Sequence, residues 1–154
     1  MRALVQRVSR CTVSVKGEVT GSIGPGLLVL LGVRKGDTNA EAEYLAARCA
    51  ALRIFPDADG KMNLSVHDVG REALVVSQFT LYADTRRGTR PSYSDAAPAS
   101  DAERLYDLFK TALSRQLDGR TVQAGVFGAM MDVELVNEGP VTVMLESLVG
   151  GERS

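Results

Sequence analysis

Two short polar segments contain residue types that can hold and polarise a carbonyl group. The first is Ser77-Gln78-Phe79-Thr80, which stands where an apolar stretch meets a long polar one. Its hydroxyl, amide and backbone N–H groups are donors of the kind that stabilise an oxyanion. Taken alone, the tetrapeptide is more simply explained as a strand that leaves the core. Carbonyl chemistry at this segment is therefore a hypothesis that needs further support.

The second segment is Asn137-Glu138-Gly139-Pro140-Val141-Thr142. Its plain interpretation is the turn of a hairpin. Gly-Pro is an unusual choice between two strands, however, because proline cannot donate to the ladder. An X-Pro bond also adopts the cis form at a cost of only about 0.5–1 kcal/mol. The turn can therefore accommodate a cis bond between Gly139 and Pro140, but the segment alone favours a turn over a site.

Several other catalytic chemistries lack the residues that they need. The chain has one histidine, His67, and a lone histidine with two scattered cysteines does not make a metal site. The sequence contains no G-x-S-x-G elbow and no phosphate-binding glycine loop. We expect no metal and no other cofactor, and we interpret His67 as a surface residue or one satisfied by its neighbours.

Composition narrows the class of protein. The 154 residues are 45% hydrophobic and carry 18 Lys and Arg against 19 Asp and Glu, for a net charge of −1. This suits one domain over residues 1–154 with a sizeable core. A broad nucleic-acid coat needs many cations, so DNA is not an expected partner, although a local basic patch is compatible with the composition. Cys11 and Cys49 form no disulfide framework, which favours the cytoplasm, and the longest apolar run, residues 27–31, is too short to cross a membrane.

Hydrophobic patterning indicates the strands that must position these segments. Lys16-Gly17-Glu18 between two alternating stretches predicts a tight hairpin. The apolar run at 27–31 predicts a central strand that is covered on both faces. The second polar segment would connect another hairpin. About seven or eight strands are expected, among them residues 3–8, 12–15, 19–23, 27–31, 73–79, 133–136 and 141–145.

Two main helices are expected beside these strands. Thr38 with Glu41 forms a capping box that opens a helix to about Leu52, and Ser100 with Glu103 forms a second box. Gly119 fits the C′ position just past the end of the second helix. These elements predict an α/β protein of the α+β type. Its sheet would be curled, barrel-like and mainly antiparallel, with two main helices packed against it.

Several segments, taken together and in order, resemble the D-aminoacyl-tRNA deacylase family, long called D-tyrosyl-tRNA deacylase. Ser77-Gln78-Phe79-Thr80 and Asn137-x-Gly139-Pro140-x-Thr142 are similar to its two signature motifs. The resemblance covers nearly the whole chain. The other similar segments are residues 1–8, 60–65, 90–93 and 125–131.

The resemblance implies a homodimeric hydrolase with the family's fold. It would cleave the ester bond of D-aminoacyl-tRNA, and of mischarged glycyl-tRNA, and release the free amino acid and tRNA. The Gly139-Pro140 backbone, with a cis bond and inserted into the partner subunit's pocket, would reject L-aminoacyl-tRNA. The implied site residues are catalytic Ser77, Gln78, Phe79 and Thr80, and substrate-binding Met131, Asn137, Gly139 and Pro140.

The role of Thr80 is open between two mechanisms. As a nucleophile, its hydroxyl would need an activating base, and the sequence offers no obvious base near it. The substrate ester is already activated, so positioning and oxyanion stabilisation can supply much of the rate. This favours Thr80 as a positioning residue, with backbone N–H groups around Phe79 and Thr80 as the oxyanion hole.

The contact with RNA is also open at this level. The long loop 84–99 carries Arg86, Arg87 and Arg90, which are candidates for phosphate contacts near the 3′ CCA end of tRNA, or else belong to a solvated charged loop. Two competing interpretations are an editing domain of the kind attached to some threonyl-tRNA synthetases and an RNA-binding module without catalysis. No synthetase sequence accompanies the 154 residues, and near-neutral charge counts against the second.

Overall fold

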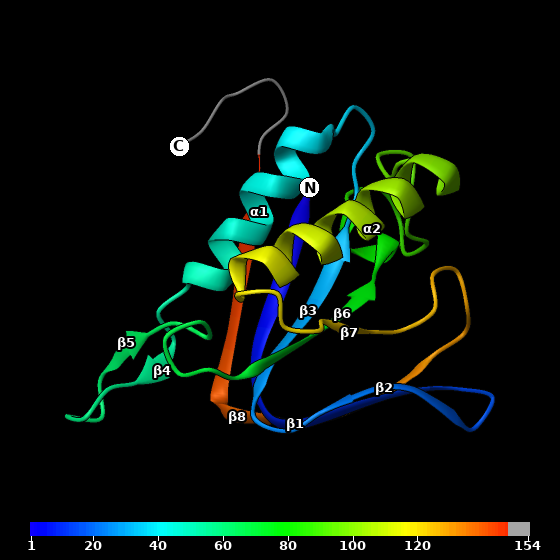
Figure 1. The fold of residues 1–154 in the computed structure, drawn as a ribbon. Coiled ribbons are helices and arrows are strands. Elements are labelled where there is room, and N and C mark those ends of the chain that lie inside the picture. The colour runs from blue at the N-terminus through cyan, green and yellow to red at the C-terminus, as the bar shows by residue number, and fades with distance from the viewer. Residues whose placement is uncertain (148–154) are drawn as a thin grey trace.

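A strongly curled sheet with two helices side by side over one face makes up the fold in the computed structural model, which describes residues 1–147 (Figure 1). The helices are α1 (Asn39–Ala51) and α2 (Ala99–Gln116), and a 3-10 helix, η1, spans Phe79–Tyr82. The described strands are β1 (Arg2–Val15), β2 (Glu18–Ile23), β3 (Gly26–Gly32), β4 (Phe55–Pro56), β5 (Met62–Leu64), β6 (Glu72–Ser77), β7 (Gln123–Ala124) and β8 (Asp132–Glu146).

β1 organises the main sheet because it is long enough to serve three partners. Its residues 2–8 pair with β3 and its residues 11–15 pair with β2, while β8 pairs along residues 2–14. All three pairings are antiparallel, and β3–β6 and β6–β7 are parallel. The sheet curls until β2 meets β7, where a Cβ on Gly21 would come within 2.7 Å of the Ala124 carbonyl oxygen. The predicted barrel-like, mainly antiparallel sheet with two helices is confirmed.

The hairpin predicted at Lys16-Gly17 is also confirmed. Both residues have positive φ, 51° and 80°, as the two central positions of a type I′ turn require. The two strands that were expected before it, residues 3–8 and 12–15, form the single strand β1. No glycine or proline lies in residues 9–11, so the chain can continue extended.

The central strand β3 is buried on both faces, as its continuous apolar run predicts. Leu27 and Val29 belong to the core under the helices. Leu28 belongs to a second cluster on the other face, together with Leu74 of the neighbouring strand. The curled sheet thus has a helix-covered face and an enclosed face, and both exclude water from β3.

Helix α1 begins as its capping box predicts. Thr38 is the N-cap, and its backbone N–H donates to the Glu41 carboxylate at 2.5 Å. Leu45 and Cys49 lie on the buried stripe, with no exposed area. Within residues 1–147, neither α1 nor any other helix is long and apolar enough to cross a membrane.

Helix α2 differs from expectation at both ends. It begins at Ala99, so Ser100 lies inside the first turn and the predicted Ser100–Glu103 box does not cap it. Pro98 takes the N-cap position, because its carbonyl already accepts the first helical bond, from Ala102 N–H at 2.9 Å. At the other end Asp118 takes the left-handed conformation, with φ 58°. Gly119 is therefore one residue further on than predicted, and its N–H donates to Ser114 at 2.8 Å.

The predicted hairpin at residues 133–145 is wrong, because these residues form the one continuous strand β8. Asp132 lies opposite Ser14 and Glu146 opposite Arg2, so β1 supplies a partner for the whole length. The polar segment between them is a bulge: the register passes from Asn137 to Thr142 while β1 advances only from Val8 to Gln6. Within this bulge the Gly139-Pro140 bond is cis, as predicted.

Candidate active site

A cavity of about 520 Å³ opens where several elements end. It lies between the ends of β3 and β6, the start of η1, the start of α2 with the residues just before it, and the connecting segment 127–131. Its wall is mostly apolar, and none of the lining residues in the described chain carries a titratable side chain. The site therefore offers shape and hydrogen-bond donors rather than an acid–base pair.

The first polar segment forms one wall of this cavity. β6 ends at Ser77, two residues earlier than expected, and the chain turns into η1 at Phe79. Ser77, Gln78 and Phe79 line the cavity. Thr80 does not line it but lies exposed beside it, and its hydroxyl accepts a hydrogen bond from the Gln78 side-chain amide. The structure thus brings the four predicted residues together at the rim.

The start of η1 leaves two backbone donors free. The Gln78 N–H is used by β3, through a 2.8 Å bond to the Leu31 carbonyl oxygen. Among residues 1–147, no acceptor lies within hydrogen-bond reach of the Phe79 or Thr80 N–H. The first N–H groups of a helix have no preceding carbonyl to bond. Two adjacent donors therefore remain beside an apolar cavity, and backbone N–H groups of this kind can stabilise an oxyanion.

Met131 also lines the cavity, at the end of the 125–131 segment. Gly125 allows the segment to fold back, since a Cβ on it would come within 2.5 Å of the Met131 sulfur. Sequence reasoning missed two neighbours, Phe127 and Met130, which also line the cavity. The signal for them was the apolar, glycine-flanked composition of residues 125–131 itself.

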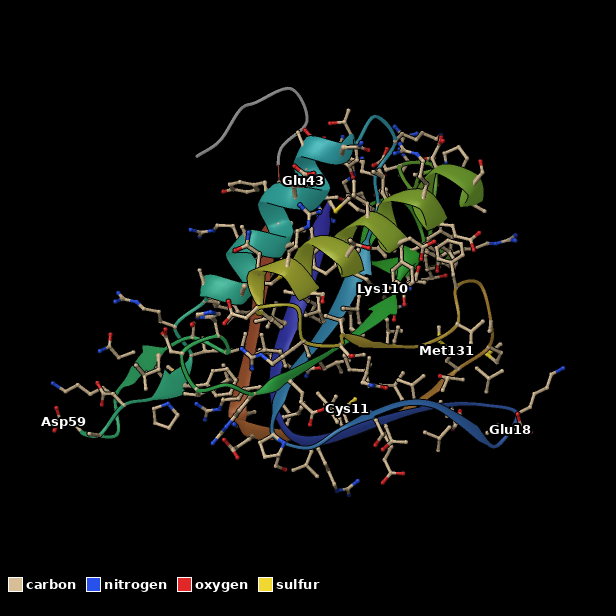
Figure 2. The ribbon with its side chains drawn as sticks, in the orientation of Figure 1. Cys11, Glu18, Glu43, Asp59, Lys110 and Met131 are labelled. Atoms are coloured by element: carbon tan, nitrogen blue, oxygen red, sulfur yellow. The ribbon has the colours of Figure 1, made fainter. Side chains whose placement is uncertain are left out.

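The second polar segment lies away from this cavity in the folded chain. Neither Gly139 nor Pro140 lines the cavity. Arg7 ties their bulge to Ile54, just before the β4–β5 hairpin, through a 2.6 Å bond to the Ile54 carbonyl oxygen. Figure 2 shows Asp59, in the turn of that hairpin, and Met131 on opposite sides of the molecule. Within one chain the two predicted motifs are therefore separate.

The Asn137 side chain is hydrogen-bonded within the bulge of β8. Its amide lies 2.9 Å from the Thr142 hydroxyl. When the amide is oriented with its oxygen toward the Thr142 hydroxyl, its nitrogen donates to the carbonyl oxygens of Arg7 and Val141, both at 3.0 Å. In one chain Asn137 thus holds the shape of the Gly139-Pro140 loop and does not line the cavity.

The arginine-rich loop is held by its neighbours at several points. Asp84 and Ser92 exchange backbone hydrogen bonds of 2.7 and 2.9 Å, and Lys35 N–H donates to the Asp95 carbonyl oxygen at 3.0 Å. The ring of Tyr93, on this loop, meets the ring of Phe79 edge-on with centroids 4.9 Å apart. The loop therefore frames the mouth of the cavity.

The three arginines of this loop differ in their partners. Arg86 grips Asp84 through Nε–Oδ1 and Nη2–Oδ2 contacts of 2.9 and 2.7 Å, and this bond lowers the pKa of Asp84 to about 2. In the part of the chain that the structure describes, Arg87 and Arg90 lie exposed with no carboxylate at salt-bridge distance. His67 is remote from this region and pairs with Asp118 at 2.9 Å, as a satisfied surface residue.

Comparison with known proteins agrees with this architecture. The D-Tyr-tRNA(Tyr) deacylase family model matches residues 4–146. A D-aminoacyl-tRNA deacylase of Roseiflexus castenholzii is 60% identical over 149 residues, covering 97% of this chain and 94% of its own length. One from Thermomicrobium roseum is 58% identical over 147 residues, covering 96% and 94%.

Two solved structures share the fold. The c-Myc DNA Unwinding Element Binding Protein superposes with a TM-score of 0.91 at 42% identity, covering 96% of this chain and 99% of that one. A probable eukaryotic D-amino acid tRNA deacylase superposes with a TM-score of 0.78 at 16% identity, covering 94% and 97%, and shows likeness of fold alone. On the family match over nearly its full length, this chain belongs to the D-Tyr-tRNA(Tyr) deacylase family.

Proposed function

We propose that this protein hydrolyses the ester bond of D-aminoacyl-tRNA and releases free D-amino acid and tRNA. The observation that carries the proposal is the pair of free backbone N–H groups, on Phe79 and Thr80, at the mouth of an apolar cavity without titratable side chains. Family membership supports the substrate class, because relatives of 60% and 58% identity are named D-aminoacyl-tRNA deacylase.

The chemistry follows from what the site offers. The ester carbonyl oxygen would sit against the Phe79 and Thr80 N–H groups, which stabilise the negative charge that develops on it. Water attacks the carbonyl carbon, the ester bond breaks, and the proton that the water loses passes to the departing ribose oxygen. The 2′-hydroxyl of the terminal adenosine lies beside that oxygen and can carry the proton, which would explain why the cavity needs no general base of its own.

Thr80 fits the role of a positioning residue better than that of a nucleophile. Its hydroxyl oxygen accepts from the Gln78 amide, and an amide nitrogen cannot remove a proton. A nucleophilic hydroxyl needs an adjacent base, and no titratable side chain lines the cavity. The Gln78–Thr80 contact instead orders the first turn of η1, which carries the two free donors.

Discrimination against L-aminoacyl-tRNA would come from the second motif, across a homodimer. Since Gly139-Pro140 lies away from the cavity of its own chain, it can act only in the cavity of a second copy. An isologous pair would place each loop in the other's site. Gly139 has no Cβ, so its backbone can approach the substrate's α-carbon closely. Backbone held by Arg7 and Asn137 would exclude an L side chain of any size, and glycyl-tRNA, which has no side chain, would also be cleaved.

The tRNA would be held by its 3′ CCA end and its phosphates, in the cytoplasm, where aminoacyl-tRNA is used. Arg86, Arg87 and Arg90 remain the candidate phosphate contacts. Arg87 and Arg90 are the stronger pair, because Arg86 already neutralises Asp84. One structural relative is named for DNA binding, so DNA duplex belongs in the test as a competitor.

The deciding experiment compares hydrolysis of D-Tyr-tRNA, L-Tyr-tRNA and Gly-tRNA by the same preparation. We expect rapid release of D-tyrosine and glycine and no release of L-tyrosine above the uncatalysed rate. Excess duplex DNA should leave the D-tyrosine rate unchanged. Equal hydrolysis of the two tyrosyl esters would exclude chiral selection, and binding of tRNA without hydrolysis would favour the non-catalytic module.

A further inference from the structure

The donors on Phe79 and Thr80 belong to η1, which is only four residues long. A 3-10 helix of this length has few internal hydrogen bonds and poor bond geometry. Here they include Leu81 N–H to the Gln78 carbonyl at 3.3 Å and Ala83 N–H to the Thr80 carbonyl at 3.1 Å. Such a turn cannot hold two donors in a fixed place by itself, so its neighbours must set its position.

One neighbour is β3, which supports the start and underside of η1. Gln78 N–H is anchored to Leu31, as described above. Gly32 lies so near that a Cβ there would come within 3.1 Å of the Leu81 Cβ and 3.3 Å of the Tyr82 ring. These contacts limit how far η1 can approach the sheet, and they include no polar contact that holds its last residues against it.

Arg2, at the start of β1, makes the contacts that hold those last residues. Its Nη1 donates to the Leu81 carbonyl oxygen at 2.8 Å. Its guanidinium carbon lies 4.6 Å from the centre of the Tyr82 ring, over the ring face. Its Nε donates to the Glu146 carboxylate at 3.0 Å, which fixes the plane of the guanidinium from the far end of β8.

We propose that Arg2 is a positioning residue that keeps η1, and with it the Phe79 and Thr80 N–H groups, in place for catalysis. The inference rests on the proposed role of those groups in the deacylation. The guanidinium suits the task because its planar fork donates in two directions while its face stacks on an aromatic ring. A cation at the carbonyl end of a helical turn is also favourable for the turn's dipole.

Among the described contacts of the Tyr82 side chain, the one with a polar group is the stacking of Arg2 on its ring. Its side chain is buried, yet within residues 1–147 its hydroxyl has no hydrogen-bond partner. The ring is therefore held by packing and by the guanidinium, and the phenolic oxygen contributes no fixed contact. This makes Arg2 the one polar group that joins the end of η1 to both β1 and β8 among the contacts described.

Arg10 provides a matched control in the same strand. It forms the same kind of ion pair with β8, from Nη1 to the Glu134 carboxylate at 2.8 Å. The pair lies exposed and makes no described contact with η1. Removing Arg10 deletes a β1–β8 ion pair alone. Removing Arg2 deletes an ion pair and also the clamp on η1, by which we mean the Arg2 contacts with the Leu81 carbonyl oxygen and the Tyr82 ring.

The experiment measures kcat and KM for D-Tyr-tRNA together with amide hydrogen exchange in Arg2→Met, Arg2→Lys and Arg10→Met. Loss of an oxyanion donor costs about 100- to 1,000-fold in kcat, so a donor that is mobile rather than lost should cost roughly tenfold. We expect this loss in Arg2→Met with KM within about twofold, a smaller loss in Arg2→Lys, and parental values in Arg10→Met. Exchange should quicken in residues 79–83 of Arg2→Met only.

The outcomes separate the clamp from the chemistry. Unchanged exchange in residues 79–83 of folded Arg2→Met would overturn the clamp. Faster exchange with an undiminished kcat would overturn the role of η1 in catalysis, and the proposed oxyanion site with it. An equal kcat loss in Arg10→Met would assign the effect to the ion pairs. Should Arg2→Met fail to fold, Arg2→Lys and Glu146→Gln carry the same comparison, and parental kcat and exchange in both would reject the proposal.

Discussion

The Nε atom of Arg7 lies 3.3 Å from both the backbone carbonyl oxygen and a carboxylate oxygen of Glu138. The guanidinium therefore grips the residue that precedes Gly139, while its Nη1 holds the Ile54 carbonyl oxygen at 2.6 Å. Its side chain is only 12% exposed, so these contacts form largely out of water. Sequence reasoning passed over Arg7, which is one arginine among several in the first strand.

We predict that Arg7→Met relaxes chiral selection. Without the guanidinium the Gly139-Pro140 backbone gains freedom, so hydrolysis of L-Tyr-tRNA should rise above background while that of D-Tyr-tRNA falls. Unpaired buried acceptors should also lower stability by about 1–3 kcal/mol, measured by urea unfolding. Glu138→Gln is the control, because it keeps the backbone contact. If Arg7→Met still rejects the L ester completely, Arg7 does not set the position of the loop.

Thr80→Ala should retain most of the activity, with a kcat loss of less than about tenfold, because the backbone donors stay in place. Single-turnover hydrolysis of D-Tyr-tRNA measures this. A near-complete loss of turnover, together with an acyl group trapped on Thr80 of the parent enzyme, would establish the nucleophile mechanism instead. A substrate with 2′-hydrogen in place of the 2′-hydroxyl is the companion test, since an undiminished rate would exclude substrate assistance.

Arg87→Ala with Arg90→Ala should reduce the slope of log K against log salt for tRNA binding by roughly two, one for each lost phosphate contact. Arg86→Ala should change the slope less, because the Arg86 guanidinium already pairs with Asp84. Filter binding over a range of salt concentrations measures the slope. Lys61→Ala, in the exposed turn of the β4–β5 hairpin, is the control. An unchanged slope in the double variant would make the loop a solvated surface.

Gly139→Ala should impair both folding and cleavage. Gly139 has φ 123°, and an added Cβ would come within 2.9 Å of Val141 Cγ2 and 3.1 Å of Arg7 Nη2. We expect a stability loss of about 1–3 kcal/mol and slower cleavage of D-Tyr-tRNA. Gly60→Ala separates the two causes, because Gly60 also has positive φ, 77°, but nothing lies within 4 Å of its Cβ position. If both variants cleave alike, close approach at Gly139 is not required.

Mixed dimers test whether the loop acts across subunits. One variant would carry a filled cavity, Ala129→Trp, and the other a blocked loop, Gly139→Trp. Each alone should be inactive. In a mixture that exchanges subunits, the unfilled cavity of the second chain meets the intact loop of the first, so activity should return to a fraction of the parental value. No recovery, or a fully active monomer in sedimentation, would exclude the shared site.

Local signals in the sequence determined most of the elements. The Thr38–Glu41 box begins α1, and the left-handed pair Lys16-Gly17 turns β1 into β2, because both features act within a few residues. The continuous apolar run of β3 correctly indicated a strand covered on both faces. The site motifs were recognisable for the same reason: Ser77 to Thr80 and Asn137 to Thr142 hold their residue types at fixed short spacing.

Only the tertiary structure decided how distant segments meet. Residues 133–145 have the pattern of a hairpin, yet β1 is long enough to pair with all of them, and the extra residues become a bulge. The free donors of Phe79 and Thr80 arise because the chain leaves the sheet at Ser77, which depends on Gln78 reaching Leu31 of another strand. The hydrogen bond from Arg2 to Leu81 spans 79 positions of the sequence, and the one from Arg7 to Glu138 spans 131. Pairing over such distances is set by packing of the whole chain, which no short pattern encodes.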